Sequence, residues 1–99
     1  MSIVVAGTFR IAPERLAALK PHFAEMAAAT AREDGCLAYA FAEDLQDPGL
    51  LRVFERWRDH AALDAHLKAT HVGAFRKAVG ADLREPSFKI FDIAGERKL

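Results

Sequence analysis

Four side chains that could move a proton or hold an aromatic ligand lie close together in the second half of the sequence: Glu55, Trp57, His66 and His71. Glu55 and Trp57 are two residues apart in a segment with strand character, so they project from the same face of a strand. His66 lies on the same side of a helical segment as Leu63. A histidine against an indole can accept or hold a proton near neutral pH, and the indole offers a rigid wall to an aromatic ligand. These residues predict a small-molecule pocket in which His66 and Glu55 are the catalytic candidates and Trp57 is a wall.

Each of these residues also has a purely structural interpretation. Trp57 and His66 could be core residues, Glu55 could be the salt-bridge partner of a nearby arginine, and His71 could be exposed at the start of a helix. Neither the residue types nor their spacing names a reaction.

Sequence motifs for cofactors are absent. The six glycines are scattered, so no phosphate-binding loop is predicted, and there is no G-x-S-x-G segment. Cys36 is the only cysteine, and His66 and His71 are five residues apart, not the four that would stack them on one helix as a zinc pair. We therefore expect no metal and no other cofactor.

The composition predicts one small domain over residues 1–99. The 14 basic and 14 acidic residues balance, and basic residues do not interleave with aromatic ones, so no nucleic-acid partner is expected. The first residues lack the features of a signal peptide, and no apolar run approaches the roughly 20 residues that span a bilayer. We expect a soluble, cytoplasmic protein that does not bind membranes.

The periodicity alternates between strand and helix. It predicts a strand at 2–11, a helix that starts at Glu14 and ends before Gly35, strands at 36–45 and 50–58, helical pieces around 63–70 and at 72–79, and a final strand from Pro86. Pro21 should kink or split the first helix.

Local signals add detail to these elements. Leu37, Tyr39 and Phe41 are expected on one side of their strand. The segment 47–49, Asp-Pro-Gly, predicts a turn that makes a hairpin of the flanking strands, and Asp59 is a candidate N-cap.

The resulting order, β-α-β-β-α-β, predicts an α+β fold of the ferredoxin-like type, with a four-stranded antiparallel sheet and helices on one face. The strands carry apolar residues on both faces; Val4 and Ala6, for example, oppose Ile3 and Val5. One layer of helices cannot cover both faces. We therefore expect a homodimer whose sheets pack face to face.

Two segments carry a family resemblance. Residues 33–39, EDGCLAY, resemble the E-x-G-C-x-x-Y segment of the antibiotic-biosynthesis monooxygenase (ABM) family, and residues 54–67, FERWRDHAALDAHL, resemble its E-x-W-x-(D/S)-x-x-A-L-x-A-H-L signature. His71, Val72 and Phe75 continue it. The resemblance covers almost the whole chain and is closest to small quinol-monooxygenase-like proteins.

This resemblance implies a dimeric α+β barrel with one pocket in each subunit. It further implies oxidation of a quinol or hydroxylated aromatic molecule by molecular oxygen, without metal, flavin or haem. Tyr39, His71 and Phe75 join Trp57 as the expected substrate-binding residues. The haem-degrading branch carries an asparagine on the first strand, and this chain contains none, which excludes haem.

Two alternatives stay open at this level. An isomerase acting on a small oxygenated metabolite could use the same pocket with His66 as proton shuttle; its phosphate-binding candidates are Arg10, Arg52, Arg56 and Lys68. A non-catalytic dimer that binds a small molecule would be favoured by a pocket filled with the protein's own side chains.

Overall fold

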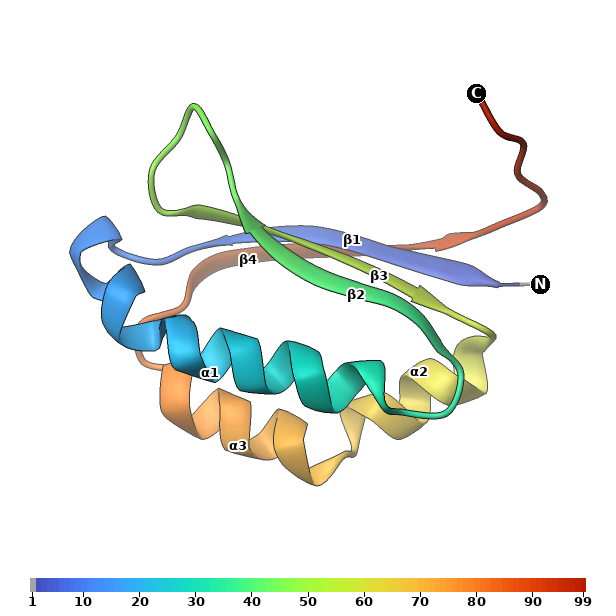
Figure 1. Ribbon diagram of the computed structural model, residues 1–99, viewed down its shortest axis with the longest axis horizontal. Helices are drawn as coiled ribbons and strands as arrows, with labels where there is room; N and C mark the ends of the chain where they lie inside the picture. Colours follow the sequence, from blue (N-terminus) through green and yellow to red (C-terminus); the bar gives the residue numbers. More distant parts are fainter. Residues whose placement is uncertain (1) are drawn as a thin grey trace.

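The computed structural model describes residues 2–99 and shows one sheet with helices on one side (Figure 1). The elements follow in the order β1 (Ile3–Arg10), α1 (Pro13–Ala31), β2 (Cys36–Glu43), β3 (Leu50–Trp57), α2 (His60–Leu67), α3 (Thr70–Val79) and β4 (Arg84–Asp92). All neighbouring strands are antiparallel, in the order β2-β3-β1-β4. The predicted ferredoxin-like fold is confirmed.

The core lies between the inner sheet face and the helices, and it has two parts. Phe9, Phe23 and Val79 belong to a cluster that joins β1, α1 and α3. Ile3, Trp57 and neighbouring residues form a second cluster at the end of the sheet covered by α2. The period-two pattern of β1 accounts for this burial, because its inward residues are 1–6% exposed.

A kink or a split was predicted at Pro21; helix α1 continues through this residue from Pro13 to Ala31, so it is not split. Pro21 lies on the exposed side of α1, whereas Leu19, Phe23 and Met26 are buried. The buried face therefore continues past the missing backbone donor, and its packing holds the helix together.

A bulge in β2 changes the predicted face of one residue. Cys36 pairs with Trp57 while Ala38 pairs with Arg56, so Leu37 is an extra residue between the two pairs. Leu37 is 57% exposed, whereas Cys36 and Tyr39 pack against the second core cluster. The prediction that Leu37 shares a side with Tyr39 was wrong because the bulge interrupts the alternation.

The turn and cap signals are confirmed. Gly49 has φ +86°, a conformation that glycine adopts without strain, in the turn that joins β2 to β3. The Asp59 carboxylate accepts a hydrogen bond of 2.9 Å from the backbone N–H of Ala62 and so caps α2. This cap fixes where α2 begins, and with it the direction in which His66 points.

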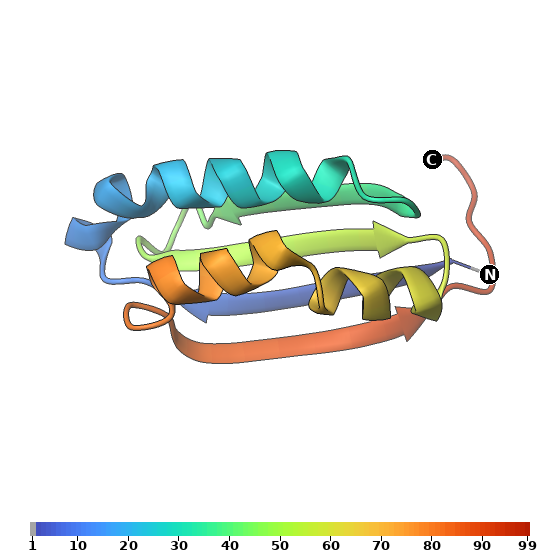
Figure 2. The same ribbon diagram turned by 90° about the horizontal axis from the view of Figure 1, so that it is seen from below.

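The helices leave two apolar surfaces uncovered. No helix lies over β4, whose inward residues Phe88 and Ile90 are about half exposed (Figure 2). On the opposite, open face of the sheet, Phe54 and Phe91 are also about half exposed. The two-faced character predicted for the strands is therefore present.

Candidate functional site

A cavity of about 400 Å³ lies between the inner face of the sheet and the helices. Its wall is mostly apolar, and its polar side chains are Tyr39, Glu55, His66 and Arg76. Phe88 forms part of the wall, and a side chain on Gly7 would collide with its ring. The other lining residues are Val5, Phe9, Met26, Phe41, Val53, Leu63, Leu67, Val72, Phe75, Leu83 and Ile90.

His66 reaches this cavity from α2 and is 3% exposed. Its Nδ1 lies 2.6 Å from Oε2 of Glu33, in the loop between α1 and β2. An ionised carboxylate only accepts hydrogen bonds, so Nδ1 carries the proton and donates it. Nε2 of the neutral ring then keeps its lone pair for a ligand.

Aromatic side chains hold the His66 ring in place. The ring centroid lies 4.7 Å from that of Trp57 and 5.6 Å from that of Tyr39. The Trp57 and His66 rings are tilted by 38° to one another, so the indole packs against the imidazole and limits its movement. The predicted contact between His66 and the indole is thus present.

Glu55 points into the cavity from β3 and is 8% exposed. The indole Nε1–H of Trp57 donates a hydrogen bond of 2.9 Å to Glu55 Oε1. Burial raises the pKa of the Glu55 carboxyl, while this hydrogen bond and the neighbouring His66 oppose the increase. A salt bridge between Glu55 and an arginine was one structural interpretation of this residue. Among residues 2–99, the hydrogen-bond partner of Glu55 is the Trp57 indole and not an arginine.

Trp57 is not a wall of the cavity. Its side chain is 0% exposed and belongs to the second core cluster, beneath Glu55 and His66. The strand pattern identified its face correctly, but at the end of β3 that face is covered by α2. Trp57 therefore affects the cavity indirectly, through neighbours such as Glu55 and His66.

The other predicted residues divide between two places. Tyr39 and Phe75 line the cavity, as expected for substrate-binding residues. His71 does not line it; it borders a separate groove between α1 and α3. Its Nε2 lies 2.9 Å from the same Glu33 oxygen that binds His66 and 3.3 Å from Oγ1 of the fully buried Thr30.

Burial keeps the remaining acidic protons of this region in place near neutral pH. Desolvation, followed by the charge of Glu55, raises the pKa of the Tyr39 hydroxyl. Desolvation also raises the pKa of the Cys36 thiol, with Glu33 and Glu55 adding to the shift. Tyr39 is therefore a hydrogen-bond donor in this cavity, and Cys36 is not an activated nucleophile.

Glu33 was not among the predicted site residues, although it opens the first segment of the family resemblance. Glu33 is distant in sequence from both histidines, and no periodicity links a loop residue to a helix. The spacing of five between His66 and His71 was also misleading. The helix is interrupted between α2 and α3, so the two imidazole rings lie on different helices. Their centroids are 6.0 Å apart.

Within residues 2–99, Glu33, His66 and His71 are the group whose atoms lie close enough to suggest a metal site. Two ligands of a tetrahedral zinc ion lie about 3.3 Å apart, given metal–ligand distances of about 2.0–2.1 Å. The nitrogen–oxygen distances of 2.6 and 2.9 Å are shorter and match hydrogen bonds. In the structure the three side chains form a hydrogen-bonded network.

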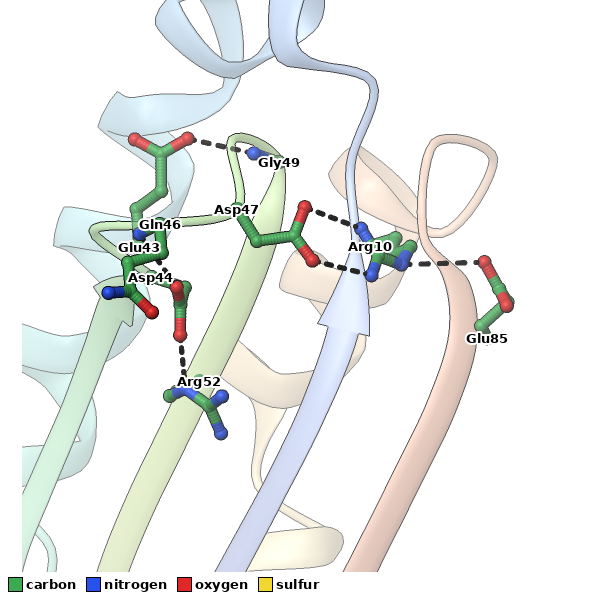
Figure 3. A network of polar contacts seen from close by, with 8 residues as sticks. All are labelled: Arg10, Glu43, Asp44, Gln46, Asp47, Gly49, Arg52 and Glu85. Carbon is green, nitrogen blue, oxygen red and sulfur yellow. Dashed lines mark hydrogen bonds and ion pairs between the residues drawn. The ribbon is translucent and has the colours of Figure 1, made fainter.

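The arginines considered as phosphate ligands lie outside the cavity. Arg10 binds Asp47 and Glu85, and Arg52 binds Asp44, at the β2–β3 turn and the end of the sheet (Figure 3). Arg56 binds Ser2 and Glu96 instead.

Lys68 does not border the cavity either, and Arg76 is the cationic residue in its wall.

Across residues 2–99, no helix combines the length and apolar character needed to cross a membrane.

Comparison with known proteins places the chain in a family. Residues 2–78 match the antibiotic biosynthesis monooxygenase family. The chain is 36% identical to Rv0793 of Mycobacterium tuberculosis, provisionally named a monooxygenase, over 85% of this chain and 82% of that protein. It is 30% identical to the probable quinol monooxygenase YgiN of Escherichia coli, over 74% of this chain and 78% of that protein.

Solved structures agree with this assignment. The structure of Rv0793 superposes with a TM-score of 0.86 and 30% identity, covering 99% of this chain and 100% of the other. A protein of Deinococcus radiodurans, provisionally named an antibiotic biosynthesis monooxygenase, gives a TM-score of 0.89 at 26% identity, covering 98% and 97%. The chain belongs to the antibiotic biosynthesis monooxygenase family.

Proposed function

We propose that this family member is a cofactor-independent monooxygenase that oxidises a quinol or a hydroxylated aromatic molecule with molecular oxygen. The observation that supports this most directly is that His66 lines an apolar cavity while a hydrogen bond to Glu33 fixes its tautomer. Nδ1 of His66 is bound to Glu33, so Nε2 is the atom available to a substrate hydroxyl. The cavity volume of about 400 Å³ suits one bicyclic aromatic ring system.

In the proposed reaction, His66 Nε2 accepts the proton of a substrate hydroxyl. The electron-rich anion transfers one electron to O₂, and the two radicals combine to form a carbon–oxygen bond. Cleavage of the O–O bond then releases water and leaves a hydroxyquinone. A quinol and O₂ thus give a hydroxyquinone and water, and the substrate itself supplies all the electrons.

The cavity wall supports each part of this scheme. Apolar residues exclude the water that would otherwise protonate the anion. The protonated Tyr39 hydroxyl can donate a hydrogen bond to a substrate oxygen, and Phe75 provides an aromatic surface. Glu55, held by the Trp57 indole, is the second acid–base group in reach of the cavity. Among residues 2–99, none of the four side chains considered as phosphate ligands, Arg10, Arg52, Arg56 and Lys68, lines the cavity, which disfavours the isomerase alternative.

The test is oxygen uptake by the purified protein with menadiol, a reduced naphthoquinone, after subtraction of the uncatalysed oxidation. His66→Gln keeps the size and hydrogen bonding of the side chain but does not titrate near neutral pH. Its turnover should fall by about 10²–10⁴-fold. His60→Gln is the matched control, because His60 is exposed and binds Asp92 away from the cavity.

Three results would contradict this function. The first is a His66→Gln variant that stays folded and whose turnover is within about twofold of the wild type, because loss of an acid–base group should cost far more. The second is activity that disappears on chelation or follows a flavin absorbance. The third is saturable binding of menadione without oxygen uptake for any quinol tested, which would assign ligand binding alone.

We also propose that the protein acts as a homodimer joined through the open face of its sheet. Phe54 of β3 and Phe91 of β4 are about half exposed there, on either side of β1, on a face that no helix covers. Phe54→Asp should convert a dimer to a monomer in sedimentation at micromolar concentration. Leu45→Asp is the control, because Leu45 is fully exposed in the β2–β3 turn. A wild-type mass near 10.9 kDa would refute the dimer.

A further inference from the structure

Two separate hollows lie on either side of the α1–α3 contact. The inner one is the cavity described above, which includes His66 but not His71. The outer one is a groove lined by α1 and α3, which includes His71 but not His66. Met26 and Phe75 border both hollows, so two apolar side chains form the partition between them.

Glu33 joins the two hollows through polar atoms. Its Oε2 lies 2.6 Å from His66 Nδ1 and 2.9 Å from His71 Nε2. The exposed fraction of these side chains increases along the hydrogen-bonded network, from 4% for His66 to 16% for Glu33 and 27% for His71. The network therefore leads in two short steps from a buried imidazole to one that water can reach.

We propose that His66, Glu33 and His71 form a proton route between the buried cavity and the outer groove. The route rests on the proposed function, in which His66 receives the substrate proton. It assigns a role to Glu33 and His71 that the cavity alone does not require. Neither residue touches the substrate; both act through His66.

The protons balance over one cycle. The substrate hydroxyl gives its proton to His66 Nε2, and His66 Nδ1 gives one to Glu33 Oε2. Glu33 passes it to His71 Nε2, which is unprotonated at this stage because the neutral His71 ring carries its proton on Nδ1. His71 then releases its Nδ1 proton to water. When the reduced oxygen takes the proton on His66 Nε2, the same path returns one to Nδ1. One proton leaves and one enters, so the proton count is consistent with a net reaction that neither releases nor takes up protons.

Thr30 makes the second tautomer of His71 possible. When His71 Nε2 carries a proton, it donates to Glu33. When this nitrogen is unprotonated, the Thr30 hydroxyl at 3.3 Å can donate to it. Thr30 is fully buried, so this hydroxyl has little competition from water. His71 Nε2 thus has a hydrogen-bond partner both when it carries a proton and when it does not.

Other titratable groups face the route at both ends. Glu55 and Tyr39 face His66 from the sheet, and Cys36 lies beside them. His22 and Glu25 of α1 and Arg32, which caps that helix, line the outer groove. Within residues 2–99, none of these six side chains forms a hydrogen bond to the side chain of His66, Glu33 or His71, so they can change the local potential but do not continue the proton route.

The experiment compares His71→Gln with His22→Gln. Glutamine at position 71 can still donate to Glu33 but cannot relay a proton, and His22 borders the same groove outside the network. With menadiol at low buffer concentration, His71→Gln should turn over about 10-fold more slowly, and added imidazole should restore the rate because it replaces the relay. His22→Gln should behave as the wild type. A His71→Gln rate that matches the wild type and does not respond to imidazole would overturn the route.

A second measurement does not need turnover. In protein labelled with ¹⁵N, magnetisation transfer from water reports how fast the His66 Nδ1 proton exchanges with solvent. This exchange should slow by about 10-fold in His71→Gln and remain unchanged in His22→Gln, since loss of a relay group affects proton transfer and not folding. Unchanged exchange in His71→Gln would refute the route. If no quinol tested is oxidised but the exchange slows as expected, the proposed function fails and the route stands.

Discussion

Replacing Trp57 by phenylalanine tests how the core supports the cavity. The substitution keeps an aromatic ring but removes the indole N–H that donates to Glu55 at 2.9 Å. A hydrogen bond to a charged group contributes about 1.5–3 kcal/mol, and the smaller ring leaves a gap of its own. Because Glu55 is 8% exposed, water cannot replace the lost donor. We expect the free energy of unfolding at neutral pH to fall by about 2–4 kcal/mol.

The pH dependence identifies the cause of this loss. Burial raises the folded-state pKa of Glu55 above its unfolded value, so the ionised carboxylate destabilises the fold above that pKa, and protonation relieves the penalty as the pH falls through it. Trp57 opposes the penalty by stabilising the carboxylate. Without the indole N–H, the pKa rises further and the penalty at neutral pH grows. The difference between wild type and variant should therefore shrink on acidification.

The assay is urea unfolding of four proteins: wild type, Trp57→Phe, Glu55→Gln and the double variant, each at about pH 7 and about pH 5. Trp57→Phe should be less damaging in the Glu55→Gln background and at the lower pH, where only the loss of packing is left. If the loss is the same at both pH values and in both backgrounds, the hydrogen bond contributes nothing and Trp57 acts through packing alone.

Further predictions concern other elements. Asp59→Ala removes the cap of α2 and should lower the free energy of unfolding by about 0.5–2 kcal/mol in urea titration. Gly49→Ala places a Cβ 2.5 Å from the carbonyl oxygen of Ile11 at φ +86°, and should cost about 1–3 kcal/mol, visible as a lower melting temperature. Iodoacetamide should alkylate Cys36 more slowly than free cysteine at neutral pH, because burial raises the pKa of its thiol.

The element order, the hairpin and most of the inward-facing strand positions could be predicted from the sequence alone; the bulge at Leu37 in β2 could not. These features depend on residues that are neighbours along the chain, such as the alternation in β1 and the Asp59 cap. The two-faced strands followed from the same alternation, and so did the prediction of an uncovered sheet face. The segments around Tyr39 and His66 also carried the family resemblance that the comparisons confirm.

Only the tertiary structure decided how deep each residue lies and which distant residues meet. Alternation places Trp57 on the inner face, but the cover provided by α2 makes it a core residue and not a wall. Glu33 meets both histidines because a loop after α1 passes the junction of α2 and α3, and no local periodicity encodes that contact. The uninterrupted α1 at Pro21 has the same origin: packing of the buried face outweighs the local preference of one residue.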